Sequence, residues 1–257
     1  MHPLNERRAA PGFLELHGEP AAARPDARRV QPRELTSLLL RWQTGARCDG
    51  LPCLDEAALR AQLECFAAEC VDRSGRLTWN EAQQRRWRAV CDALVASALA
   101  QPRFVVHGEG LVLQRLQGAD GAAGLAGPDA MCGPVLWDLC SLLCDPALAT
   151  DEAQQLDGAV RWWQEARHAE AMQGHPMAAD FGECWRAFEW TMLLRTLGRI
   201  GRTCRDAAET GAPMPQERLA PLFQDVTRIA LRYAPLAPLL TLLAPLSGQM
   251  LADGFTF

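Results

Sequence analysis

Residues 104–145 read FVVHGEGLVLQRLQGADGAAGLAGPDAMCGPVLWDLCSLLCD, and this segment is the most informative one about the fold. It opens with an apolar run at 104–106, and further short runs follow at 111–115 and 123–125 with glycines between the last two. Runs of this length bounded by glycines are typical of strands joined by turns. The apolar segment that closes the stretch, residues 135–144, predicts a helix. The sequence therefore predicts a few short strands around a polar loop, followed by a helical region.

The polar loop places a histidine, a carboxylate and an amide side chain close together in the sequence. His107, Gly108 and Glu109 follow the first strand, and Gln114 stands five residues past Glu109. Kinase-type phosphoryl transfer needs a carboxylate that accepts the substrate proton, an amide oxygen five residues later for one Mg²⁺, and a second aspartate for the bridging metal. Glu109 and Gln114 fit the first two places but are each one methylene longer than the usual aspartate and asparagine. Ala126 stands where the metal aspartate is expected, and it cannot coordinate an ion.

Motifs on both sides of this loop carry a family resemblance. They are LLLRWQ at 38–43, ALAQP at 98–102, DF-x-E from Asp180, and YAPLAPLLTLL at 233–243. After the loop, a run resembling D-A-x-x-G-P-x-x-Y-D-L-x-S-L-L is matched by Asp129, Ala130, Gly133, Pro134, Trp137 (in place of tyrosine), Asp138, Leu139, Ser141, Leu142 and Leu143. The set resembles the aminoglycoside phosphotransferase superfamily, and most closely its N-acetylmuramate/N-acetylglucosamine anomeric kinases. The resemblance spans roughly residues 12–243.

This resemblance implies both a fold and an ancestral activity. The implied fold is mainly α (α+β): the helical C-terminal lobe of a protein-kinase-like phosphotransferase, with a few short strands around the catalytic loop. The implied activity is ATP- and Mg²⁺-dependent phosphorylation of an amino-sugar hydroxyl in cell-wall recycling. An amino sugar or a partner protein chain is the expected ligand.

The resemblance also implies roles for individual residues. Glu109 occupies the catalytic base position, and His107 is the loop-orienting histidine or, alternatively, a histidine packed at a strand end. Gln114 and Asp129 are the weak Mg²⁺ and cofactor-binding candidates, although Asp129 also fits a solvated turn. Asp138 corresponds to a buried aspartate that hydrogen-bonds the backbone of the catalytic loop from a neighbouring helix, which is a structural role.

Two hypotheses about activity follow. The chain departs from the family at Ala126, contains no lysine to hold a phosphate, and has too few residues before its first helix for a nucleotide-binding lobe. These departures favour a pseudokinase, a decayed remnant that is inactive on its own. The alternative is an active or partner-assisted sugar phosphotransferase that uses Glu109 as base.

A second group of candidate residues lies on a predicted helix near residue 190. The apolar positions Phe188 and Met192 continue at helical spacing as Arg195, Arg199 and Arg202. A stripe that begins apolar and turns basic can leave the core and face an anionic substrate or an acidic partner. The alternative is a solvated face that pairs with acidic side chains.

Composition narrows the class of protein. The formal net charge is −5 with a pI near 5.6, which argues against nucleic acid as a partner. The 10 cysteines lack paired metal-ligand spacing, so we expect no metal other than Mg²⁺ and reduced, mostly buried thiols. With no signal peptide and no apolar run long enough to cross a bilayer, we expect a cytoplasmic protein without membrane contact.

The predicted organisation is a leader, a lobe and a tail. Residues 1–32 form a poorly ordered leader in which 12–18 could be the last strand and hinge of a nucleotide lobe, 33–244 form the kinase-like helical lobe, and 245–257 form a C-terminal tail. A capping box at 78–81 is expected to open the third helix. Periodicity and capping signals predict helices over 33–43, 54–71, 135–144, 151–172, 180–206 and 215–233, with shorter helical turns to 243. The third helix is expected to run from the capping box at 78–81 to its end at Pro102.

Overall fold

The structure, a computed structural model, describes residues 32–73, 77–107, 129–175 and 177–253. The expected leader with its strand and hinge at 12–18 lies outside these residues. So do the strands expected at 111–115 and 123–125. Within the described residues the chain is mainly α, with eight α-helices and one two-stranded antiparallel sheet. The predicted fold class, mainly helical with short strands beside the loop, is confirmed.

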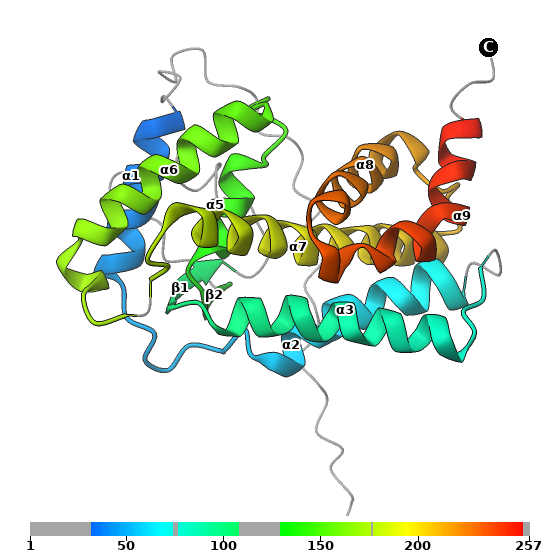
Figure 1. Cartoon of the computed structure of the whole chain (residues 1–257), viewed down its shortest axis with the longest axis horizontal. Coiled ribbons are helices and arrows are strands. Elements are labelled where there is room, and N and C mark those ends of the chain that lie inside the picture. Colours follow the sequence, from blue (N-terminus) through cyan, green and yellow to red (C-terminus); the bar gives the residue numbers. More distant parts are fainter. Residues whose placement is uncertain (1–31, 74–76, 108–128, 176, 254–257) are drawn as a thin grey trace, which may run out of the picture.

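Helix α7 (Phe181–Thr210) is the centre of the molecule (Figure 1). Asp180 caps its first turn by accepting a hydrogen bond from the Glu183 backbone, and Gly211 ends it in the left-handed conformation at φ 65°. In Figure 1, α2 (Glu56–Phe66) and α3 (Glu81–Leu99) lie below α7, and α8 (Gln216–Arg232) lies above it. The middle of α7 is buried from several sides, as an all-round apolar helix requires.

The remaining helices form two groups at the ends of α7. At one end, α1 (Pro32–Gly45), α5 (Leu136–Leu143) and α6 (Glu152–His168) pack together. At the other end, α9 (Pro238–Asp253) packs on α3 and α8. Short turns Glu170–Met172 and Ala234–Leu236 precede α7 and α9. Helix α9 runs past residue 244, so the predicted tail begins inside a helix.

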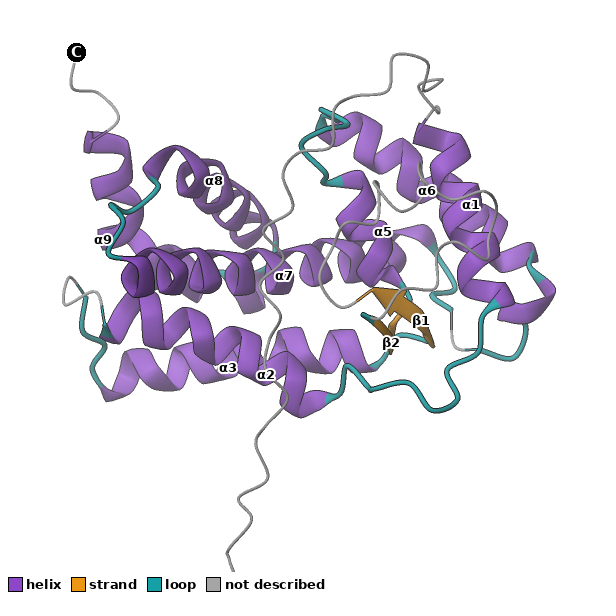
Figure 2. Cartoon of the chain, turned by 180° about the vertical axis from the view of Figure 1, so that it is seen from behind, coloured by secondary structure: helices purple, strands orange, loops and turns teal. Residues whose placement is uncertain are grey.

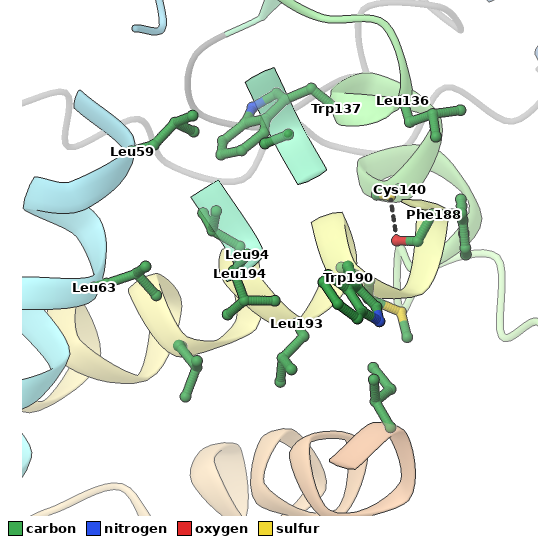
Figure 3. Close-up of a cluster of buried hydrophobic side chains, with 14 of the residues drawn as sticks. Leu59, Leu63, Leu94, Leu136, Trp137, Cys140, Phe188, Trp190, Leu193 and Leu194 are labelled. Carbon is green, nitrogen blue, oxygen red and sulfur yellow. Dashed lines mark hydrogen bonds between the residues drawn. The ribbon is translucent and has the colours of Figure 1, made fainter. Parts of the chain in front are cut away.

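The side chains that meet between these helices form one continuous core. Figure 3 shows part of it, with residues from α2, α3, α5 and α7. The stripe predicted for the second helix, Leu59, Leu63, Phe66 and Cys70, is buried, and so is the set predicted for the third, Trp87, Val90, Cys91, Leu94, Val95 and Ala98. All 10 cysteines are free, and six of them are buried. The helical periodicity of the sequence thus correctly predicted which residues of the second and third helices are buried.

Two local predictions are corrected. The capping box of α3 is formed by Asn80 and Gln83, not by the residues at 78 and 81: the Asn80 side chain accepts from the Gln83 N–H at 3.0 Å, and the Gln83 side chain accepts from the Asn80 N–H at 2.9 Å. Trp79 is buried, and its indole N–H points to the Leu242 carbonyl, so the chain enters the helix only after it. The second helix is also not uniform, because it ends in a π-helical turn at Ala67–Asp72.

The sheet joins β1 (Arg103–His107) to β2 (Ala130–Pro134), a strand that the sequence pattern did not reveal (Figure 2). The register pairs Phe104 with Gly133 and His107 with Ala130. A Cβ at Gly133 would lie 2.6 Å from the Val106 side chain, so only glycine lets the strands approach this closely. The hairpin therefore brings residues 107 and 130, the two flanks of the polar loop, next to each other.

Candidate functional site

The first candidate site is the end of the hairpin where β1 meets α5. Asp138 of α5 is fully buried, and both its carboxylate oxygens lie 3.0 Å from the His107 backbone nitrogen. Its Oδ2 lies 2.8 Å from His107 Nδ1. Because a carboxylate accepts hydrogen bonds, the imidazole donates from Nδ1 in this pair. The side chain of Asp138 thus fixes both the backbone and the ring of His107.

Helix α1 holds the other face of His107. The Trp42 ring stacks on the imidazole with 4.4 Å between centroids and 14° between planes. The neighbouring Gln43 is fully buried and donates from Nε2 to the Val135 carbonyl at 3.0 Å. Trp42 and Gln43 therefore pack against the imidazole and the start of α5, whereas Arg41 of the same motif is exposed.

The motif at 98–102, at the end of α3, also contacts the start of α5. Gln101 donates from Nε2 to Thr191 Oγ1 of α7 at 2.8 Å and accepts from the Leu136 N–H at 3.2 Å. The Val135 N–H donates to the Pro102 carbonyl at 2.9 Å. Motifs far apart in sequence thus meet at the start of α5. Their polar side chains satisfy buried backbone groups, which would otherwise be costly to bury.

The structure places some of the residues predicted for the catalytic loop, and the others lie outside the described part of the chain. His107 and Asp138 are brought together, and Asp129 lies half-buried directly before β2. Glu109, Gln114 and Ala126 lie outside the described residues. His107 is fully buried and its Nδ1 is engaged by Asp138, so its side chain does not face solvent. Within the described residues, no cluster of three or more His, Cys, Asp or Glu side chains could hold a metal ion.

The second candidate site is a cavity of about 220 Å³ between α2, α5 and α7. All three arginines of the predicted basic stripe line it. Arg195 lies over the Trp137 ring at 4.4 Å from the centroid, and its Nη2 donates to Ser141 Oγ. The described lining is Gln62, Trp137, Cys140, Ser141, Cys144, Asp145, Pro146, Met192, Arg195, Thr196, Arg199 and Arg202.

The electrostatics of this cavity are set by its arginines. Asp145 is the single carboxylate among the described lining residues, and its Oδ1 accepts from the Ala147 N–H at 2.9 Å. Burial raises the pKa of the Cys144 thiol to about 12, with Asp225 adding to the rise and nearby arginines opposing it. Burial likewise raises the pKa of Cys140. Both thiols are therefore neutral at pH 7, so the cavity is cationic and offers no thiolate nucleophile.

A buried ionic cluster on α7 is one feature that the sequence reading missed. Glu189 is fully buried, receives a bond of 2.5 Å from Arg232 and one of 2.6 Å from the Tyr233 hydroxyl. Burial first, and then the bond to Glu189, raises the pKa of Tyr233. The available signal was a glutamate inside an otherwise apolar stretch of α7. This cluster joins α7 to the end of α8.

The fold and the first site together describe a mainly helical chain in which a buried aspartate, Asp138, fixes the histidine at the end of β1. This is the arrangement implied for kinase-like phosphotransferases. No family model and no solved structure matches the chain.

The sequence is similar to three curated proteins that share one name. The chain is 31% identical over 221 residues to an N-acetylmuramate/N-acetylglucosamine kinase of Neisseria meningitidis, with 85% of this chain and 65% of the relative covered. It is 31% identical over 208 residues to the kinase of that name from Pseudomonas putida, with 81% and 60% covered. The corresponding protein of Pseudomonas aeruginosa is 30% identical over 196 residues, with 76% and 57% covered. The chain is a distant homologue of these amino-sugar kinases and spans less than two thirds of their length.

Proposed function

We propose that this protein is an amino-sugar-binding relative of the anomeric sugar kinases of cell-wall recycling, and that its phosphoryl transfer is impaired. The observation that carries the proposal is the contact between Asp138 and His107. A buried carboxylate that accepts from both the backbone and the ring of one histidine is costly to build and holds the start of the loop in place. The scaffold for a catalytic loop is therefore kept, and residues 33–244 are proposed to be its helical lobe.

The proposed roles within the loop follow the family pattern. Glu109 stands at the base position, and His107 orients the loop. Gln114 and Asp129 are the Mg²⁺ and cofactor candidates. Mg²⁺ is usually held by one or two carboxylates together with substrate phosphates. With Ala126 at the place of the metal aspartate, the loop has an amide and one displaced carboxylate, and we infer that Mg²⁺-ATP binds poorly.

A second candidate function is an active or partner-assisted sugar phosphotransferase. The observation in its favour is that Glu109 is still a carboxylate and follows a histidine whose position is fixed. A longer side chain can act as a base if its oxygen reaches the substrate hydroxyl. Displacement of a catalytic group by about 1 Å can, however, cost about a hundredfold in rate.

The test compares the two ligands by their effect on stability. We expect N-acetylmuramate or N-acetylglucosamine to raise the thermal midpoint, and Mg²⁺-ATP to leave it unchanged. A working nucleotide site would stabilise the protein by about 2.7 kcal/mol at a hundredfold excess over the dissociation constant. Such a response to Mg²⁺-ATP would refute the impairment. No response to either sugar would refute the proposed ligand.

The variant Ala126→Asp tests the reason given for impairment. It returns a carboxylate to the metal position, so it should confer a Mg²⁺-dependent response to ATP that the natural chain lacks. Ala130→Asp is unsuitable as a control because residue 130 is buried in β2. Ala147→Asp, at an exposed position after α5, adds the same charge away from the loop and should confer no response.

A further inference from the structure

The arginine cavity has features that the proposed phosphotransfer does not use. Its arginines come from successive turns of α7, whereas Ser141 comes from α5 and Gln62 from α2. Three helices thus contribute polar groups to one small space. A solvated basic face would be flat, but these guanidinium groups line a hollow of about 220 Å³.

One arginine of this hollow, Arg195, is held in place before any ligand arrives. Arg195 is clamped between the face of Trp137 and the Ser141 hydroxyl, and Met192 one turn earlier is buried. Arginine is always charged, and its planar fork matches the oxygens of carboxylate and phosphate groups. A guanidinium that stacks on an aromatic ring loses little further freedom when it binds. The geometry is that of a preorganised oxyanion contact.

The charge balance points to a ligand of opposite sign. Three arginines and one aspartate line the described part of the cavity, and Asp145 already accepts a backbone hydrogen bond. Arg199 is exposed, whereas Arg195 and Arg202 are half-buried.

The size of the cavity limits what enters it. Sites for drug-sized ligands measure about 300–1,000 Å³, and this one is smaller. It therefore suits a compact oxyanion, or the anionic end of a larger molecule, rather than a whole nucleotide. The cavity wall at Trp137 directly precedes Asp138, which fixes the loop, so α5 serves both sites.

We propose that the cavity lined by Arg195, Arg199 and Arg202 is a binding site for a small oxyanion, carboxylate or phosphate. Resting on the proposed function, its occupant is the lactyl carboxylate that N-acetylmuramate carries and N-acetylglucosamine lacks. The site then gives the protein its preference between two sugars that share the same ring and N-acetyl group.

Isothermal titration of the full chain with N-acetylmuramate, N-acetylglucosamine and inorganic phosphate tests this. We expect N-acetylmuramate to bind at least about tenfold more tightly than N-acetylglucosamine, and phosphate to compete with it. The exposed Arg199 is the first position to change, because Arg199→Gln removes one charge without disturbing the stack on Trp137. It should weaken N-acetylmuramate about tenfold or more and leave N-acetylglucosamine unchanged. Arg86→Gln, at an exposed position on α3, is the matched control and should change neither.

The outcomes separate this proposal from the one before it. Equal affinities for the two sugars, unaltered in Arg199→Gln, would overturn the oxyanion site and leave the sugar-binding function standing. Phosphate binding that is lost in Arg199→Gln, without any response to either sugar, would support the site as a phosphate site and refute the proposed function. Absence of binding by both phosphate and N-acetylmuramate would overturn the site.

Discussion

Replacing Asp138 by alanine should destabilise the lobe more than any single surface change. The substitution removes a buried acceptor from two donors, the His107 N–H at 3.0 Å and Nδ1 at 2.8 Å. Each hydrogen bond to a charged partner contributes about 1.5–3 kcal/mol, and breaking a buried pair costs about 3–5 kcal/mol in total. We therefore expect the free energy of unfolding to fall by about 3–5 kcal/mol.

Urea unfolding followed by tryptophan fluorescence measures this loss. With a slope of about 3 kcal/mol per molar urea, the midpoint should fall by about 1–2 M. Asp138→Asn keeps one acceptor oxygen for the His107 N–H and should lie between the natural protein and Asp138→Ala.

The matched control is Asp92→Ala. This aspartate also pairs with a basic side chain, Arg60 at 2.8 Å, but the pair is at the surface. Surface pairs contribute about 0–1 kcal/mol, so its midpoint should barely move. Equal effects of the two substitutions would refute the reasoning, because burial would then add nothing to the contact with His107.

Three further predictions concern other parts of the fold. Gly201→Ala should lower the free energy of unfolding by about 1–3 kcal/mol, because its Cβ would lie 2.6 Å from a backbone nitrogen of α2. Gly45→Ala, which has open space around its Cβ, is the control and should have little effect in the same urea assay. Equal losses of stability in the two variants would contradict the close approach at Gly201. Tyr233 is the chain's single tyrosine, so absorbance at 295 nm reports its ionisation alone, and the midpoint should be higher in the native protein than in urea. Because burial raises the pKa of Tyr233 in the folded protein, the neutral phenol's contribution to folding stability is complete below the ordinary pKa of 10.0 and is lost as the pH rises towards the folded pKa. Equal ionisation midpoints in the native and the urea-unfolded protein would exclude the raised pKa. The sulfurs of Cys70 and Cys204 lie 3.1 Å apart, so the two thiols should reduce one equivalent of diamide and form a disulfide. Peptide mass spectrometry should detect this disulfide in the natural protein and not in Cys204→Ser. A disulfide between other cysteines instead would count against this pairing.

The helical architecture was predictable because its signals are local. The apolar stripes of α2 and α3 follow from spacing alone, and their buried residues were assigned correctly. The cap of α3 was placed two residues early, because residues 78 and 81 satisfy the same capping pattern as Asn80 and Gln83. The choice between the two depends on Trp79, whose burial against Leu242 is a contact across 163 residues. Local patterns do not contain that information.

The sites were predictable only in part for the same reason. The helical spacing of Arg195, Arg199 and Arg202 indicated that they share a face, but the cavity also needs Ser141 and Gln62 from other helices. Strand β2 depends on its partner β1 for its hydrogen bonds and has few β-branched residues. The contact of Asp138 with the loop was expected through family resemblance, since nothing in its spacing from His107 requires it.

The measurement that tests the account most directly is phosphorus NMR of the purified 257-residue chain with Mg²⁺-ATP and N-acetylmuramate. We predict that the sugar remains unphosphorylated while calorimetry of the same sample detects its binding. Formation of a sugar phosphate that disappears in Glu109→Ala would contradict it, and would identify this chain as a working kinase.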